Sequence, residues 1–107
     1  MSDVTVDLAK EITAHGEKVK ELVLREPDGE DLMEIGYPYI VVQSDVGGQG
    51  VELRPKVVAR YVSKLAKIPM SSVKQIGLAD LQKLQGVVMG FFGQEEAATT
   101  NSTESDS

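Results

Sequence analysis

The residues of this chain that could do chemistry are few, and they do not form a known catalytic arrangement. His15 is the only histidine among 107 residues, and it stands next to Gly16 without a nearby nucleophile. A histidine acts as a general base only within reach of the proton that it takes, so we interpret His15 as a turn residue. The chain has no cysteine, which excludes disulfides, zinc–thiolate sites and cysteine nucleophiles.

Two other segments resemble ligand sites in composition but not in spacing. Glu30, Asp31 and Glu34 lack the alternating oxygen ligands and the closing glutamate of a calcium loop. The glycines at 47–50 lack the Lys-Ser/Thr pair of a phosphate-binding loop. We interpret the acids as a solvated helix face and the glycines as a flexible loop. We therefore predict no catalytic residue, no metal site and no cofactor.

Basic residues suited to binding a partner follow one face of a predicted helix at 54–68. Lys56, Arg60, Lys64 and Lys67 recur there at helical spacing. Such a basic stripe could meet an acidic partner or phosphates, although a solvated surface is the more common role of such residues.

Apolar residues near position 90 form the second candidate surface. Phe91 and Phe92 are adjacent, and two neighbouring residues on a helix cannot both face the core. The sequence thus predicts that one of them, or Val87, is exposed and available for contact. The candidate partner-binding residues are therefore Val87, Val88, Phe91, Phe92, Lys56, Arg60 and Lys64.

The charge composition favours a soluble protein and is unevenly distributed. Seventeen acidic residues against eleven basic ones give a net charge of −6, which argues against general nucleic-acid binding. Twelve acids and four bases occur through Glu52, whereas seven bases and one acid occur in 54–83. A molecule divided in this way can associate with itself or with an asymmetric partner. No apolar run approaches the roughly 18 residues of a membrane span, so we expect a cytoplasmic protein without membrane contact.

The amino-terminal segment is typical of a β-hairpin. Val4, Val6 and Leu8 alternate with polar residues, as in a half-buried strand. His15-Gly16 suits a two-residue turn, because glycine tolerates the positive φ of that turn. This turn sets a register that pairs Ile12 with Val19, Leu8 with Val23, Glu11 with Lys20 and Lys10 with Glu21.

The following segments predict three or four helices. Asp28 is a suitable N-cap for a short helix at 29–36, which Gly36 would end. Residues 37–43 are expected to be extended, with a third strand near 40–42. Pro55 suits the first turn of the next helix. The apolar stripe of that helix comprises Val57, Val58, Tyr61, Val62, Leu65 and Ile68.

Beyond Pro69 the pattern predicts two more helical pieces. Ser72 and Gln75 have the spacing of a capping box at the start of one, and the last helix is predicted at 79–92. The fold class is therefore α+β: an amino-terminal β-hairpin packed on a small bundle of three to four helices. We expect one domain at 1–93, and a disordered acidic Ser/Thr-rich tail at 94–107 that is too polar to fold.

A set of short motifs, in a fixed order, is similar to those of a known family. The resemblance covers roughly residues 4–93 and is to the tail assembly chaperone family of Mu-like contractile-tailed phages. The motifs are Gly16, Leu24-Arg25-Glu26-Pro27, Gly29-x-Asp31-Leu32, Gly36-Tyr37-Pro38, Ala59-Arg60-Tyr61, Leu65-Ala66-x-Ile68-Pro69, Ser72-Val73, Asp80 and Gly90-Phe91-Phe92.

The resemblance implies a non-enzymatic protein that binds the tape measure protein and keeps it soluble during tail tube assembly. It further implies a location in the cytoplasm of a bacterial host, and absence from the mature virion. A longer form, made by a translational frameshift at the codons for Gly90-Phe91-Phe92, would recruit the tail tube protein. Two alternatives remain open: a small nucleic-acid-binding regulator that uses the basic helix 54–68, and a structural tail component of the virion.

Overall fold

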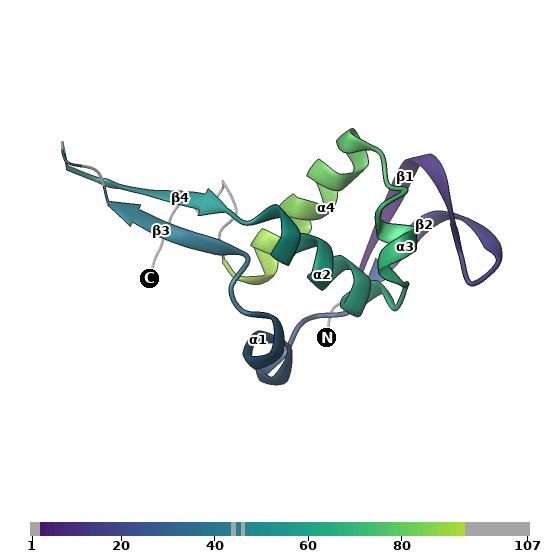
Figure 1. The fold of residues 1–107 in the computed structure, drawn as a ribbon, viewed down its shortest axis with the longest axis horizontal. Helices are drawn as coiled ribbons and strands as arrows, with labels where there is room; N and C mark the ends of the chain where they lie inside the picture. Colours follow the sequence, from purple (N-terminus) through teal and green to yellow (C-terminus); the bar gives the residue numbers. More distant parts are fainter. Residues whose placement is uncertain (1–2, 44, 46, 94–107) are drawn as a thin grey trace.

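The computed structural model describes residues 3–43, 45 and 47–93. Two antiparallel two-stranded sheets lie at opposite ends of the molecule, with the helices between them (Figure 1). The described part is α+β, as predicted. The elements are β1 (Val4–Ala14), β2 (Glu17–Leu24), α1 (Gly29–Ile35), β3 (Tyr39–Gln43), β4 (Gln49–Leu53), α2 (Pro55–Ala66), α3 (Met70–Val73) and α4 (Leu78–Phe91).

The hydrophobic core lies between the β1–β2 hairpin and helices α2 and α4. The predicted apolar stripe is buried throughout, and all of it except Ile68, which follows the end of α2, lies on that helix. Leu84 and Val88 of α4 meet this stripe, and Ile12 and Leu24 of the hairpin close the other side. Burial of each such side chain stabilises the fold by about 1.5–3 kcal/mol.

The turn of the first hairpin is confirmed, and its register is confirmed in part. His15 and Gly16 both have positive φ, 55° and 76°, as a two-residue turn requires. Ile12 pairs with Val19, as predicted. The register then shifts between Asp7 and Ile12. The predicted pairs Leu8–Val23, Glu11–Lys20 and Lys10–Glu21 are wrong, and the observed pairs are Thr5–Val23, Val6–Leu22 and Asp7–Glu21.

The register shift has its cause outside the hairpin. The backbone N–H groups of Ala9 and Lys10 donate to the two carboxylate oxygens of Asp80 on α4, each at 2.9 Å. Buried or partly buried backbone donors need a partner, and Asp80 supplies it where β2 does not. The alternation of apolar and polar residues along β1 does not depend on this distant carboxylate. The sequence pattern therefore could not predict the bulge, which is the irregular part of β1 between Asp7 and Ile12.

The short helix α1 forms as predicted. Asp28 caps its amino end, and a reciprocal capping box with Asp31 satisfies both backbone donors. Gly36 ends the helix with a φ of 94°, a conformation that glycine adopts without steric cost.

The capping box predicted at Ser72 and Gln75 is wrong. Helix α3 begins after Pro69, so Ser72 lies inside it. The Ser72 hydroxyl donates to the carbonyl oxygen of Thr13 at 2.7 Å, and the Gln75 amide oxygen accepts from the Thr13 N–H at 2.8 Å. The two side chains therefore join β1 to α3 and to the turn that follows α3, and they do not cap a helix.

The predicted third strand is present as β3, but it does not join the first hairpin. It pairs with β4, which the sequence did not predict, and together they form a second ribbon. The glycine loop is correspondingly shorter than expected, because Gln49 and Gly50 belong to β4. Gly50 and the polar Gln49 and Glu52 weaken the strand pattern of this segment. The expected disorder of 94–107 lies outside the described residues.

Candidate partner-binding surface

The carboxyl end of α4 holds the apolar residues predicted to bind a partner. Val88 is fully buried in the core, so it supports the fold and offers no contact surface. Val87, Phe91 and Phe92 are half-buried and pack against the edge of the core. None of these four apolar residues is fully exposed, and Phe92 contacts further aromatic residues that reach solvent.

An aromatic cluster surrounds Phe92. Its ring centroid lies 6.0 Å from that of Tyr37, 6.4 Å from that of Tyr39 and 5.4 Å from that of Tyr61, all in edge-to-face arrangements. Tyr61 is buried, whereas Tyr37 is 50% exposed. The cluster thus runs from the core to solvent. Sequence reasoning did not include Tyr37 and Tyr39 among the candidates, although Tyr37 stands in the Gly36-Tyr37-Pro38 motif.

The backbone that carries Tyr37 is held in place from two sides. The Tyr61 hydroxyl donates to the carbonyl oxygen of Gly36 at 2.8 Å. The Arg54 N–H donates to the carbonyl oxygen of Pro38 at 2.9 Å, and the Pro38 side chain is buried. Burial raises the pKa of the Tyr61 phenol. These bonds present Tyr37 on a fixed support, which lowers the entropy lost when a partner binds.

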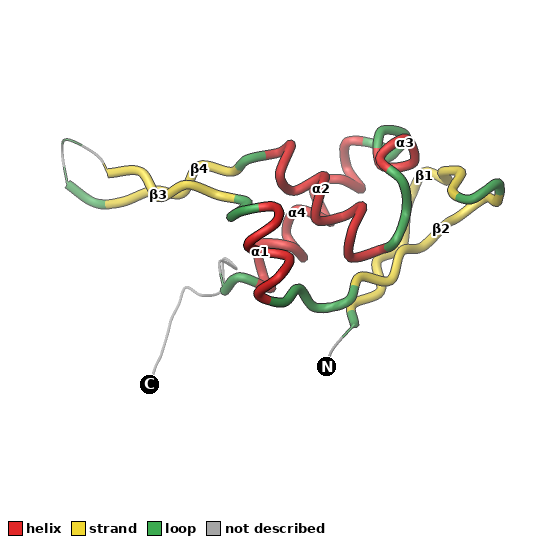
Figure 2. Tube along the Cα trace, turned by 60° about the horizontal axis from the view of Figure 1, so that its bottom comes forward, coloured by secondary structure: helices red, strands yellow, loops and turns green. Residues whose placement is uncertain are grey.

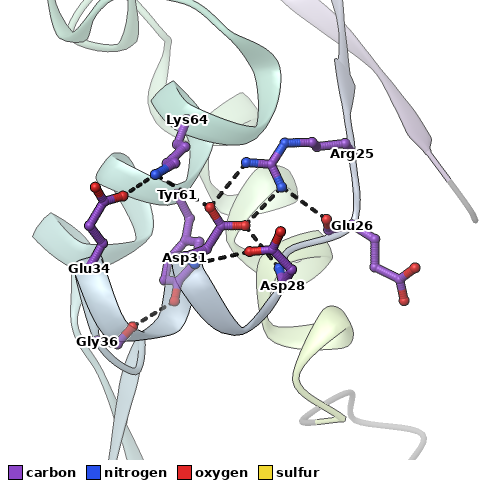
Figure 3. Close-up of polar contacts among 8 residues, drawn as sticks. All are labelled: Arg25, Glu26, Asp28, Asp31, Glu34, Gly36, Tyr61 and Lys64. Carbon is purple, nitrogen blue, oxygen red and sulfur yellow. Dashed lines mark hydrogen bonds and ion pairs between the residues drawn. The ribbon is translucent and has the colours of Figure 1, made fainter.

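An ion-pair cluster centres on Asp31, which is only 1% exposed (Figure 3). Its carboxylate accepts two bonds from the Arg25 guanidinium, at 2.8 and 3.0 Å, and one from the Asp28 N–H at 2.9 Å. The Lys64 ammonium lies 3.5 Å away. The hydrogen bonds from Arg25 hold the pKa of Asp31 well below its usual range. The interpretation of Asp31 as part of a solvated face is therefore wrong.

The basic stripe on α2 is interrupted by this cluster. Lys64 contacts the carboxylates of Glu34 and Asp31, and its hydrogen bond to Glu34 is the main cause that raises the pKa of Lys64. Lys56 and Arg60 are exposed. Lys64 is thus engaged within the fold, which leaves a smaller basic surface than the sequence suggested.

His15 makes a contact that supports the fold. Its Nε2 lies 3.0 Å from the carbonyl oxygen of Lys67, the residue that ends α2 in a left-handed conformation with a φ of 58°. The interaction joins the hairpin turn to the end of the helix. Within the ranges 3–43 and 47–93, no cluster of three or more histidine or acidic side chains is arranged to hold a metal ion.

The described helices are all too short or too polar to cross a membrane. The family described as phage tail assembly chaperone proteins, E, or 41 or 14, matches residues 5–93. This match spans most of the chain, and the chain belongs to that family, so the predicted tail assembly chaperone family is confirmed. No curated protein and no solved structure matches it.

Proposed function

We propose that this protein is a non-enzymatic chaperone that binds the tape measure protein and keeps it soluble while the tail tube assembles. Its membership of the tail assembly chaperone family, over residues 5–93, is the observation that carries this proposal. The family supports a role in tail assembly and contact with tail proteins. The tape measure protein, as an aggregation-prone helical chain, is the client that we propose.

The aromatic cluster is the surface that suits such a client. Tyr37 and Phe92 are large and partly exposed, and aromatic side chains of this kind commonly supply much of the energy of an interface. An amphipathic helix binds by laying its apolar face on a hydrophobic surface. We place the apolar face of a client helix over Tyr37, Tyr39 and Phe92, beside Val87 and Phe91.

Charge contributes to the same role. The net charge of −6 favours solubility of a complex with an aggregation-prone partner. Lys56 and Arg60 are exposed cations on α2, and they suit contacts with acidic residues of the client. Lys64 belongs to the Asp31 cluster and is expected to act on binding only through the stability of the fold.

Co-expression with the tape measure protein tests this proposal. Wild-type protein should raise the soluble fraction of the tape measure protein several-fold. Tyr37→Asp should abolish most of this gain, because it places a charge at the centre of the apolar contact. Leu78→Asp is the matched control, since Leu78 is 74% exposed and begins α4, whereas the aromatic cluster lies at the other end of that helix.

The outcomes distinguish an error in the proposed function from an error in the proposed binding surface. If wild-type protein leaves the tape measure protein insoluble, the proposed function is wrong. If Tyr37→Asp rescues solubility as well as wild type does, the binding surface lies elsewhere, and Lys56→Glu with Arg60→Glu is the next test. Circular dichroism of each variant shows whether its fold is retained.

A chaperone acts before the particle is complete, so we place this protein in the host cytoplasm and outside the mature virion. Mass spectrometry of purified particles from the source phage tests this location. Its presence there in amounts comparable to the tube protein would instead identify a structural tail component.

We also propose a longer product that recruits the tail tube protein. A ribosome can slip back one base on a run of uridines, such as codons for Gly90-Phe91-Phe92 can contain. Helix α4 ends at Phe91, so a slip at these codons would preserve the described strands and helices. A second binding module on the same chain would raise the local concentration of tube subunits. The nucleotide sequence tests this directly, because a Gly90 codon that does not end in U excludes the slip.

A further inference from the structure

The β3–β4 ribbon extends away from the helices at one end of the molecule (Figures 1 and 2). Its apolar side chains are about half exposed: Ile40 45%, Val41 51%, Val42 42% and Val51 46%. An isolated two-stranded ribbon is only marginally stable in water. An additional strand would therefore cover exposed apolar surface of this ribbon and stabilise its marginal pairing.

The outer edges of the ribbon have free backbone groups. The bond from Arg54 N–H to the Pro38 oxygen marks a hydrogen-bonded pair, and such pairs alternate along an antiparallel ladder. Ile40 and Val42 therefore bond inward to β4. Tyr39, Val41 and Gln43 direct their N–H and C=O groups outward, and no backbone hydrogen bond from another described element reaches them.

The β3 edge lacks the features that usually prevent strand addition. Natural edge strands carry charges, prolines or bulges that block pairing with another chain. The sequence of β3 is Tyr-Ile-Val-Val-Gln, without a charge or proline, and its pairing with β4 is regular over all five residues. In a protein with a net charge of −6, this strand is a segment where two copies can meet with little repulsion.

We propose that two copies of this chain pair antiparallel through their β3 edges, about a two-fold axis at Val41. The result is a four-stranded sheet in the order β4–β3–β3–β4. Val41 then lies opposite Val41 of the second copy, Tyr39 opposite Gln43, and Ile40 opposite Val42. Each pair is uncharged, and the edge is complementary to itself.

The β4 edge is less suited to the same pairing. A two-fold axis at Val51 would place Glu52 of each copy diagonally across from the other, on one face of the sheet. Like charges in such positions are destabilising. Gly50 would lie opposite each Glu52 and add no side-chain contact. The second copy is therefore assigned to β3.

The dimer is expected to be reversible. Pairing along a strand of five residues buries less surface than the roughly 1,000 Å² of a stable interface. Pairing also joins two apolar faces, because Tyr39, Val41, Val51 and Leu53 share one side of each ribbon by alternation. This self-association does not depend on the tape measure protein, so the two proposals fail independently.

Sedimentation equilibrium of the full chain measures the association. The average mass of the wild type should rise from 11.6 kDa toward twice that value as the concentration is raised from about 10 µM to about 1 mM. Val41→Pro should remain monomeric, because proline removes the outward donor without breaking the ladder to β4. Val51→Pro is the matched control: it removes an outward donor from the other edge and should dimerise as the wild type does.

Cysteine cross-linking locates the interface independently of the proline variants. The chain contains no cysteine, so a single Val41→Cys substitution reports one site. Its two copies should oxidise to a disulfide-linked dimer, since the Cα separation of directly paired residues, about 5.5 Å, permits the bond. Val51→Cys should not cross-link, because two strands would lie between its copies.

Three results would overturn the proposal. They are a wild-type protein that stays monomeric at about 1 mM, a Val41→Pro variant that dimerises as the wild type does, and cross-linking at Val51→Cys without cross-linking at Val41→Cys. If the β3 edge instead accepts an extended segment of a tail protein, the wild-type protein alone would stay monomeric.

Discussion

The carboxylate of Asp80 accepts the backbone N–H of Lys10 at 2.9 Å, across 70 positions of the sequence. Its other oxygen accepts the N–H of Ala9 at the same distance. These two bonds join α4 to the irregular part of β1, where the register of the hairpin shifts. They also lower the pKa of Asp80, because the charged carboxylate is the better acceptor.

Asp80→Asn should lower the free energy of unfolding clearly, because an amide offers only one oxygen to two backbone donors. Urea denaturation at neutral pH measures the change. Asp7→Asn is the matched control, as it removes the same charge from an exposed side chain of β1. Equal stability of the two variants would show that the bonds from Ala9 and Lys10 to Asp80 do not stabilise the fold.

Stability should fall in acid because of Asp31 and Asp80. Both carboxyls have a pKa in the folded protein below the ordinary value of about 3.9. A carboxyl group whose pKa is lower in the folded state than in the unfolded state stabilises the fold at pH values above its unfolded pKa. This contribution to the free energy of unfolding is lost as the pH falls toward the folded pKa.

We therefore expect the free energy of unfolding to decrease as the pH falls below about 5. Urea denaturation at a series of pH values should show a shallower decrease in the free energy of unfolding for Asp31→Asn than for wild type. A wild-type protein that gains stability in this range would contradict the pKa directions of both carboxyls.

Loss of the Arg25 guanidinium should destabilise the protein by about 1–2 kcal/mol, because it leaves the buried Asp31 with fewer donors. Part of the effect is offset, since the Arg25 side chain is 34% exposed and Lys64 stays near. Arg25→Gln measures this by urea denaturation. Arg60→Gln removes an exposed guanidinium from α2 and should change the stability little.

Tyr61→Phe should cost about 1 kcal/mol, because it leaves the Gly36 carbonyl without its donor while the ring stays packed. The same change at the half-exposed Tyr37 should cost less. Thermal or urea denaturation compares the two variants. A Tyr61→Phe variant as stable as wild type would show that the hydroxyl does not hold the support of the aromatic cluster.

The sequence by itself determined the elements whose causes are local. Asp28 and Gly36 set the two ends of α1, and each does so through a hydrogen bond to a residue only three or four positions away. Pro55 begins α2, and the spacing of its apolar residues selects the buried face. The His15-Gly16 turn fixed the nearest pairs of the hairpin, because a two-residue turn leaves no freedom in their register.

Tertiary contacts decided the rest. Asp80 shifts the register of β1 from α4, and Ser72 donates to β1 instead of forming a capping box. Asp31 is buried between Arg25, six positions before it, and Lys64 of α2. Asp80, Ser72 and Lys64 each meet a polar partner from a distant segment, and such a partner leaves no periodic trace in the sequence.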